Sequence, residues 1–262
     1  MFLVVLGVIS LFISTFFIAY KKSDISVIDL IWAPACFLVY LLCFGQNLEK
    51  IAMREIILGL CLFVWSIRLS SYLTIRHNQQ NFNDFRYAQI RQKWLSHFWA
   101  KSFFYIYMFQ ALACLVISSP FYFLMINQNN PLWGTWSDYM GLTLFFIGFI
   151  FESIADYQKH MFKKTSLKGE VFTEGVWRYS RHPNYFGEVT LWWGLGFICY
   201  SELSFIQSFI SPAILTILIL YFTGINLLEN KYRDNTEFKK YKKKTSLFFP
   251  WFPKKEEHYE RT

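Results

Sequence analysis

The stretch Phe2-Leu-Val-Val-Leu-Gly-Val-Ile-Ser-Leu-Phe-Ile-Ser-Thr-Phe-Phe-Ile-Ala19 contains no charged residue. About 20 apolar residues are enough for a helix to cross the hydrocarbon part of a bilayer. The first basic residues, Lys21 and Lys22, follow this stretch, whereas a cleavable signal peptide carries its basic residues in front. The stretch therefore predicts a first membrane-spanning helix with its N-terminus outside.

Further apolar stretches of similar length follow along the chain, and together they predict an all-α integral membrane protein. Aromatic residues make up 21% of the sequence, as expected for lipid-facing helices with Trp and Tyr at the interfaces. The number and length of the apolar runs argue against a soluble aromatic core. We expect a bundle of about seven transmembrane helices, over roughly 2–20, 27–44, 55–74, 103–125, 139–157, 186–202 and 207–228 by hydropathy.

The distribution of Lys and Arg predicts the orientation of these helices. If the C-terminus is inside, the outside loops carry only Lys50 and Arg54, and all other loop Lys and Arg residues face inward. Basic residues favour the cytoplasmic side, so we expect an N-out, C-in topology. The net charge of +8 is explained in this way by the lipid bilayer, and no nucleic-acid partner is expected. We expect a single transmembrane domain over 1–262 with a cytoplasmic basic tail over 230–262.

Five cysteines lie inside apolar stretches, and none has the spacing of a zinc site. We therefore interpret them as small buried hydrophobic residues and expect no metal site.

Ionisable residues inside the predicted spans are costly in lipid and indicate function or internal pairing. Glu152 and Asp156 are four residues apart and so share one helix face. Two carboxylates there need a cationic or hydrogen-bonding group opposite them, and Arg178, Arg181 or a ligand could provide it. Three other ionisable residues are explained equally well by a structural ion pair and by a functional role. They are Asp29, Arg68 and Glu229.

The segment Gly175-Val-Trp-Arg-Tyr-Ser-Arg-His-Pro-Asn-Tyr-Phe-Gly-Glu188 combines cations and hydrogen-bonding groups at the predicted start of a helix. Pro183 suits a first helical turn, and helix N-termini offer amide donors to anions. Planar Arg side chains suit phosphate, and His can assist them. By themselves these residues predict an anionic ligand, for which a lipid headgroup would also serve.

The same segment resembles the C-terminal signature of the sterol reductases and the steroid 5-alpha-reductases. Over nearly its full length the chain resembles an uncharacterised bacterial branch of membrane proteins in that superfamily. The matching motifs are Asp29-Leu-Ile-Trp32, Trp65-Ser-Ile-Arg-Leu-Ser70, Asp84-Phe-Arg-Tyr87, Phe151-Glu-Ser-Ile-Ala-Asp156, Arg181-His-Pro-Asn-Tyr-Phe-Gly-Glu188 and Lys244-Thr-Ser-Leu-Phe-Phe-Pro250.

The resemblance implies a helical bundle that holds NADPH in a pocket open to the cytoplasm, with the cofactor-binding part within 103–262. It also implies that Asp29 and Tyr72 bind the carbonyl group of the substrate as catalytic residues. The cofactor-binding candidates are Glu152, Asp156, Lys163, Arg178, Tyr179, Arg181, His182, Asn184, Tyr185, Glu188 and Tyr241.

The expected reaction is the NADPH-dependent reduction of a carbon–carbon double bond conjugated to a carbonyl in a lipophilic, steroid- or lipid-like substrate. One alternative is a methyltransferase that uses S-adenosylmethionine, because isoprenylcysteine carboxyl methyltransferases carry a related Arg-His-Pro-x-Tyr signature. Another is a non-enzymatic lipid-binding membrane protein. The expected location is a bacterial inner membrane, with the cofactor site facing the cytoplasm. The sequence specifies neither the substrate nor the oligomeric state.

Overall fold

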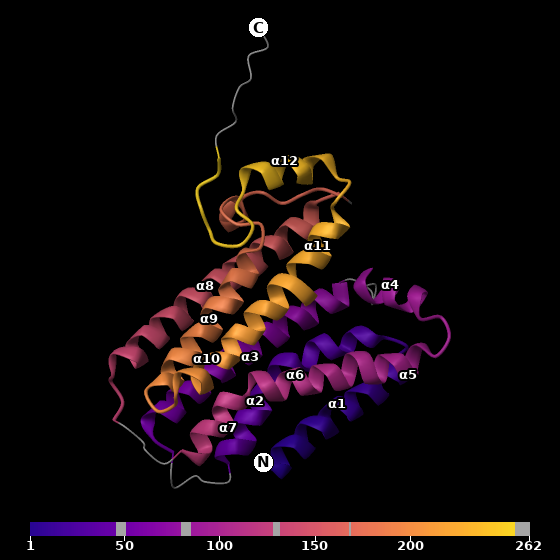
Figure 1. Ribbon diagram of the computed structural model, residues 1–262. Helices are drawn as coiled ribbons and strands as arrows, with labels where there is room; N and C mark the ends of the chain where they lie inside the picture. The colour runs from indigo at the N-terminus through magenta and orange to yellow at the C-terminus, as the bar shows by residue number, and fades with distance from the viewer. Residues whose placement is uncertain (46–50, 80–84, 128–131, 168, 255–262) are drawn as a thin grey trace. The chain divides into compact units, whose positions relative to one another are not determined.

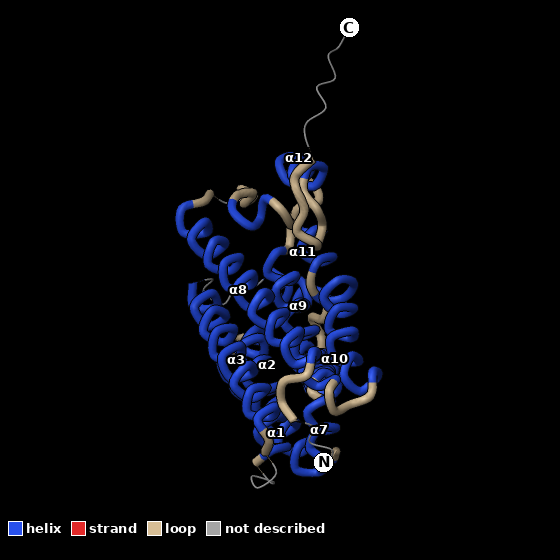
Figure 2. Tube along the Cα trace, turned by 90° about the vertical axis from the view of Figure 1, so that its left-hand side faces the viewer, coloured by secondary structure: helices blue, strands red, loops and turns tan. Residues whose placement is uncertain are grey.

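The computed structural model describes residues 1–45, 51–79, 85–127, 132–167 and 169–254, and in these residues helices predominate without any strand (Figures 1 and 2). The α-helices are α1 (Phe2–Lys22), α2 (Ile28–Phe44), α3 (Met53–Gln79), α4 (Phe85–Lys93), α5 (Phe98–Ser102), α6 (Phe109–Ile117), α7 (Ser119–Ile126), α8 (Trp136–Thr165), α9 (Pro183–Tyr200), α10 (Phe205–Ile217), α11 (Ile225–Lys231) and α12 (Thr236–Lys244). Shorter helical turns join them: η1 (Ile25–Val27), η3 (Phe103–Met108), η4 (Gly175–Arg178) and η5 (Leu218–Thr223).

In the part of the chain that the structure describes, six helical segments are long and apolar enough to cross a membrane, so the predicted all-α membrane bundle is confirmed. They cover Phe2–Lys22, Ile25–Phe44, Met53–Gln79, Phe98–Ile117, Trp136–Thr165 and Phe205–Phe222. Helix α9 lies over the predicted span 186–202 but is not among these six; its first turns carry Asn184 and Glu188. The N-out, C-in orientation stays a prediction.

The fourth span differs from its predicted bounds of 103–125. The helical segment begins earlier, at Phe98, and ends at Ile117, after which Ser118 leaves the helical region with φ −86° and ψ 2°. Pro120 then lies in the first turn of α7. Proline lacks an N–H group and clashes with the preceding turn, so it ends one helix and starts another at little cost.

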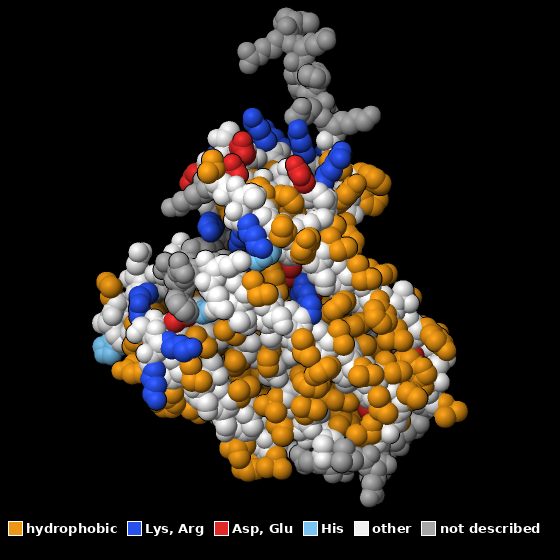
Figure 3. All heavy atoms as spheres, turned by 180° about the vertical axis from the view of Figure 1, so that it is seen from behind, with side chains coloured by type: hydrophobic (Ala, Val, Ile, Leu, Met, Phe, Trp, Pro, Cys, Tyr) orange, Lys and Arg blue, Asp and Glu red, His pale blue; other side chains and the backbone are white. Residues whose placement is uncertain are grey.

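Hydrophobic side chains are exposed over much of the surface seen in Figure 3. On α8, for example, Ile147, Ile150 and Ile154 are each more than 40% exposed and follow one another at helical spacing. In water such a stripe would be unfavourable, whereas in a membrane protein it is the lipid-facing side.

The chain forms two compact units, which are described separately. The first comprises Met1–Leu142 and Leu195–Ala213, and the second comprises Thr143–Gly194 and Ile214–Thr262. In the first unit, α2 packs against α1, α3 and α7. The single domain expected over 1–262 stays a prediction.

In the second unit, α8 and α9 approach each other closely at two glycines. A Cβ atom on Gly148 would lie 2.4 Å from the Leu191 nitrogen, and one on Gly187 would lie 2.5 Å from the Glu152 nitrogen. Both neighbours are backbone atoms, which cannot move aside without separating the helices. The two glycines therefore bring the backbone of Glu152 directly against the first turns of α9.

We predict that Gly148→Ala lowers the thermal stability of the protein, because overpacking a tight contact costs about 1–3 kcal/mol. Gly7→Ala is the matched control, since its Cβ would meet only the flexible end of Leu42 and alanine favours helix. The measurement is thermal unfolding in detergent. A Gly148→Ala variant as stable as Gly7→Ala would contradict the close helix contact.

Candidate functional site

Arg181 lies directly in front of α9 and is the central residue of the candidate site. Its side chain is only 6% exposed, and its Nη2 atom lies 3.1 Å from Glu229 Oε1 on α11. The Nε and Nη1 atoms are also buried, and neither has a hydrogen-bond partner among the described residues. A buried guanidinium group with unused N–H donors costs free energy unless an acceptor binds there. Arg181 is therefore prepared for an anion.

Glu229 gathers several basic groups around Arg181. Its Oε2 atom accepts a hydrogen bond from Lys242 Nζ at 2.8 Å, and its Oε1 atom lies 3.5 Å from His182 Nε2. Burial alone would raise the pKa of Glu229, but the nearby His182, the hydrogen bond from Lys242 and the charge of Arg181 outweigh it and lower the pKa to about 2. Glu229 is therefore ionised at neutral pH.

The charge balance of this cluster is positive. Burial lowers the pKa of His182 despite the opposing effect of Glu229, so the imidazole is neutral at neutral pH. Arg181 and Lys242 then contribute two positive charges and Glu229 one negative charge. One positive charge remains, together with two unused donors on Arg181. The cluster can therefore bind an anion with its own residues alone.

Aromatic and acidic side chains of α8, of α9 and of the residue before α9 form further contacts in the same unit. His182 and Tyr185 stack with ring centroids 5.7 Å apart and an interplanar angle of 12°. Asn184 Nδ2 donates to Asp156 Oδ1 at 3.3 Å, and Trp192 Nε1 donates to Glu188 Oε1 at 3.1 Å. The buried carboxylates Asp156 and Glu188 therefore have neutral hydrogen-bond donors on α9.

The sequence prediction for these carboxylates is refined by the structure. The sequence left three candidates to face Glu152 and Asp156: Arg178, Arg181 or a ligand. The structure instead gives Asp156 a partner in Asn184, while Arg181 pairs with Glu229. Glu152 is 3% exposed. Three other candidates, Lys163, Arg178 and Tyr179, lie at the surface, where they are available to a ligand but not built into the interior.

The C-terminal tail holds the Arg181 segment in place. The Tyr241 hydroxyl donates to the backbone carbonyl of Trp177 and lies 3.1 Å from that of Ser180. Ser180 Oγ donates to the Phe248 carbonyl at 2.7 Å, and the Arg181 N–H donates to the Ser246 carbonyl at 2.9 Å. Burial raises the pKa of Tyr241, so its hydroxyl stays a donor. The tail therefore fixes the backbone that carries Arg181.

Asp29 belongs to the first unit and has partners that the sequence did not suggest. Its carboxylate accepts hydrogen bonds from Tyr87 Oη at 2.7 Å and from Arg86 Nη2 at 2.5 Å. Tyr72, the predicted co-catalytic residue, has the Arg68 guanidinium over its ring at 5.8 Å. Tyr87 is thus a second candidate for a role beside Asp29. Its motif also includes Asp84, which lies outside the described residues.

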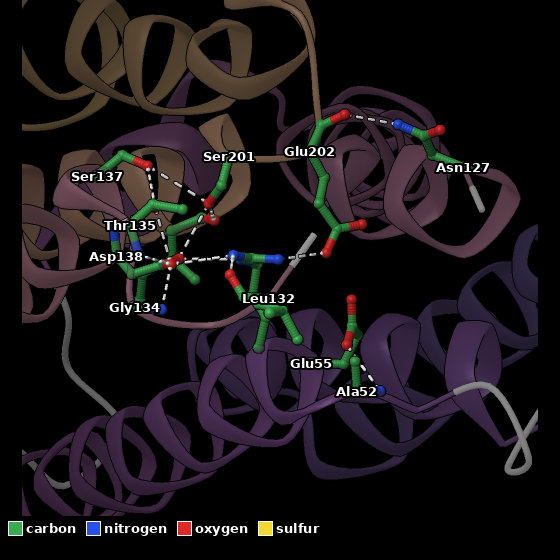
Figure 4. A network of polar contacts seen from close by, with 12 residues as sticks. Ala52, Glu55, Asn127, Leu132, Gly134, Thr135, Ser137, Asp138, Ser201 and Glu202 are labelled. Atoms are coloured by element: carbon green, nitrogen blue, oxygen red, sulfur yellow. Dashed lines mark hydrogen bonds and ion pairs between the residues drawn. The ribbon is translucent and has the colours of Figure 1, made fainter. Parts of the chain in front are cut away.

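A buried ionic network in the first unit was missed by the sequence analysis (Figure 4). Arg54 was expected in an outside loop, but it lies in the first turn of α3 and is 1% exposed. It forms ion pairs with Asp138 at 2.9 Å and Glu202 at 2.7 Å. These partners are 84 and 148 residues away in the sequence, so local patterns could not reveal them. The signal that could have found them is that all three residues border predicted outer span ends.

We predict that Tyr241→Phe destabilises the tail, because a buried carbonyl that loses its donor costs about 1–3 kcal/mol. The measurement is limited proteolysis of the C-terminal tail, which should become faster. Tyr221→Phe is the control, because Tyr221 is 65% exposed. Equal cleavage rates in the two variants would show that Tyr241 does not hold the tail.

Comparison with known proteins identifies the family of the chain but not an activity. The chain matches, over residues 15–245, the family described as Protein of unknown function (DUF1295). It is 27% identical over 195 residues to a Schizosaccharomyces pombe protein named Uncharacterized protein C594.04c. The matched region covers 65% of this chain and 56% of that relative. No solved structure matches. The family match covers most of the sequence, and the chain therefore belongs to the DUF1295 family.

Proposed function

We propose that this multi-pass membrane protein is an NADPH-dependent reductase of carbon–carbon double bonds conjugated to a carbonyl, acting on a lipophilic substrate. The observation that carries the proposal is the buried Arg181 side chain, which has two N–H donors without a partner among the described residues. The expected cytoplasmic, inner-membrane location of the cofactor site is part of the same proposal.

The residues of the second unit fit the chemistry of NADPH. Its phosphates are multiply charged anions, and a planar Arg side chain in a cluster of net positive charge suits them. Lys163 and Arg178 are exposed basic residues that can add to this charge. The stacked His182 and Tyr185 rings offer a flat surface. S-adenosylmethionine has no phosphate and carries a sulfonium cation, so it makes less use of these groups.

Each group of side chains has a distinct role in the proposed reaction. Arg181 would bind a phosphate, held by Glu229 and by the tail. Asn184, positioned by Asp156, and Glu188, positioned by Trp192, would hydrogen-bond the nicotinamide and ribose groups. The bound cofactor supplies a hydride, and this chain supplies orientation and charge placement.

In the first unit, a tyrosine assisted by Asp29 would donate a hydrogen bond to the substrate carbonyl oxygen. Negative charge builds on that oxygen as the double bond is reduced, so a fixed donor stabilises the transition state. The resemblance favours Tyr72 for this role. Tyr87 is a second candidate because it contacts Asp29, and its hydroxyl proton would have to turn from Asp29 to the carbonyl oxygen. Arg86 orients the Asp29 carboxyl group through its direct contact.

We predict that the purified protein binds NADPH more tightly than NADH, and that Asn184→Ala loses most of this affinity. Arg181→Lys should weaken NADPH binding about tenfold or more, since a lost hydrogen bond to a charged group costs roughly 1.5–3 kcal/mol. The measurement is isothermal titration calorimetry in detergent. The matched control is Asn226→Ala, which changes an exposed asparagine in the same unit.

Three outcomes of this titration contradict the proposal in different ways. Unchanged NADPH affinity in Asn184→Ala would reject the site. Binding of S-adenosylmethionine without NADPH would favour the methyltransferase alternative. Binding of neither cofactor would favour a lipid-binding protein.

We predict that replacing the catalytic tyrosine lowers the rate of NADPH oxidation about 100-fold or more while leaving NADPH affinity unchanged, because removal of one donor from an oxyanion site costs about 2.7–4 kcal/mol. The assay compares Tyr72→Phe with Tyr87→Phe, using cholest-4-en-3-one and a fatty-acyl enone as probes. Tyr221→Phe serves as the control. If neither variant loses activity that the wild-type protein shows, the assignment of both tyrosines is wrong.

A further inference from the structure

The described residues of the ionic network in the first unit contain more acids than bases. Arg54 contacts Asp138 through Nε and Nη2, both at 2.9 Å, and Glu202 through Nη1 at 2.7 Å. The side chains of all three residues are fully buried. Glu55, which is 2% exposed, is a third acid in the same cluster. One guanidinium group thus faces three buried carboxyl groups.

Asp138 is the natural ionised partner of Arg54. Besides the two Arg54 bonds, its carboxylate accepts from the N–H of Gly134 at 3.1 Å and from the N–H and hydroxyl of Thr135, both at 2.9 Å. Ser201 Oγ donates to it at 2.9 Å. Several hydrogen bonds donated to one carboxylate stabilise its charged form. Asp138 therefore balances the charge of Arg54.

Glu202 is bonded very differently. Its Oε1 atom accepts one bond from Arg54, whereas its Oε2 atom is buried and has no hydrogen-bond partner among the described residues. The Glu202 side chain points toward Glu55 in Figure 4, and the two carboxyl groups interact directly. Two ionised carboxylates in such contact repel each other, while a proton on one of them turns the contact into a hydrogen bond.

Glu55 is the better acceptor of the two. Its Oε2 atom accepts the Ala52 N–H at 2.9 Å, and it lies in the first turn of α3, where the helix dipole favours negative charge. Among the residues that the structure describes, the other ionisable groups near the pair are Tyr40 on α2 and Cys199 on α9, and neither adds positive charge. Tyr40 donates its hydroxyl to the Glu55 backbone carbonyl at 2.7 Å.

We propose that Glu202 and Glu55 form a buried proton-binding site, in which a proton on Glu202 Oε2 is donated to the Glu55 carboxylate. Without this proton the cluster would bury two unbalanced negative charges, which costs several kcal/mol per ion. With it, one negative charge remains, at the N-terminus of α3. Burial and the Glu55 carboxylate both raise the pKa of Glu202, and the hydrogen bond from Arg54 opposes them.

The proton makes this end of the first unit sensitive to pH. Because the pKa of Glu202 is raised in the folded protein, the stability that its neutral form supplies is present at low pH. That contribution is lost as the pH rises through the folded-state pKa. Loss of the proton leaves like charges in contact where α3, the start of α8 and the segment after α9 meet.

The experiment is infrared difference spectroscopy of the detergent-solubilised full-length protein at neutral pH, comparing wild type with Glu202→Gln. We expect a carbonyl stretch of a protonated carboxyl group in the wild-type protein that is absent from Glu202→Gln. Glu237→Gln, which removes an exposed acid in α12, should leave this band unchanged. Absence of the band in wild type, or its persistence in Glu202→Gln, would overturn the proposal.

Glu55→Gln tests the same proton in a protein that keeps Glu202. If Glu202→Gln does not fold, this variant still tests whether Glu202 and Glu55 share a proton. Removing the negative charge of Glu55 should make the Glu202 band disappear at a lower pH than in wild type. A band that titrates at the wild-type pH would show that Glu55 does not share the proton.

Discussion

The ion pair between Arg181 and Glu229 is the interaction on which the candidate site depends. A guanidinium group that is 6% exposed must be compensated by charge, and Glu229 provides it at 3.1 Å. Lys242 and His182 converge on the same carboxylate, so a single acid organises three basic side chains. Its one negative charge does not cancel theirs, and the remaining positive charge gives the cluster its capacity for an anion.

Two features of the second unit support this pair without carrying charge. Gly148 and Gly187 bring α8 and α9 into backbone contact, which sets Asp156 within reach of Asn184. The C-terminal tail pairs with the segment around Ser180, and Ser180 and Ser246 form an isolated parallel bridge. Segments that are more than 60 residues apart in the sequence thereby build one rigid support for Arg181.

Local patterns in the sequence predicted the membrane helices well, because apolar length is a property of contiguous residues. The same reasoning placed Arg181, His182 and Asn184 together, since they are neighbours in one motif. It could not assign Glu229 to Arg181, Tyr87 to Asp29, or Asp138 and Glu202 to Arg54. Each of these pairs joins residues at least 48 positions apart, and only the fold selects which of several acids meets which base.

The central claim is that Arg181 binds a phosphate of NADPH, and a cryo-electron microscopy structure with NADPH tests it most directly. The account predicts density for a phosphate group within hydrogen-bond distance of Arg181 Nε and Nη1, the two atoms that have no partner among the described residues. Bound NADPH whose phosphates lie away from Arg181, or no bound nucleotide at saturating NADPH, would contradict it.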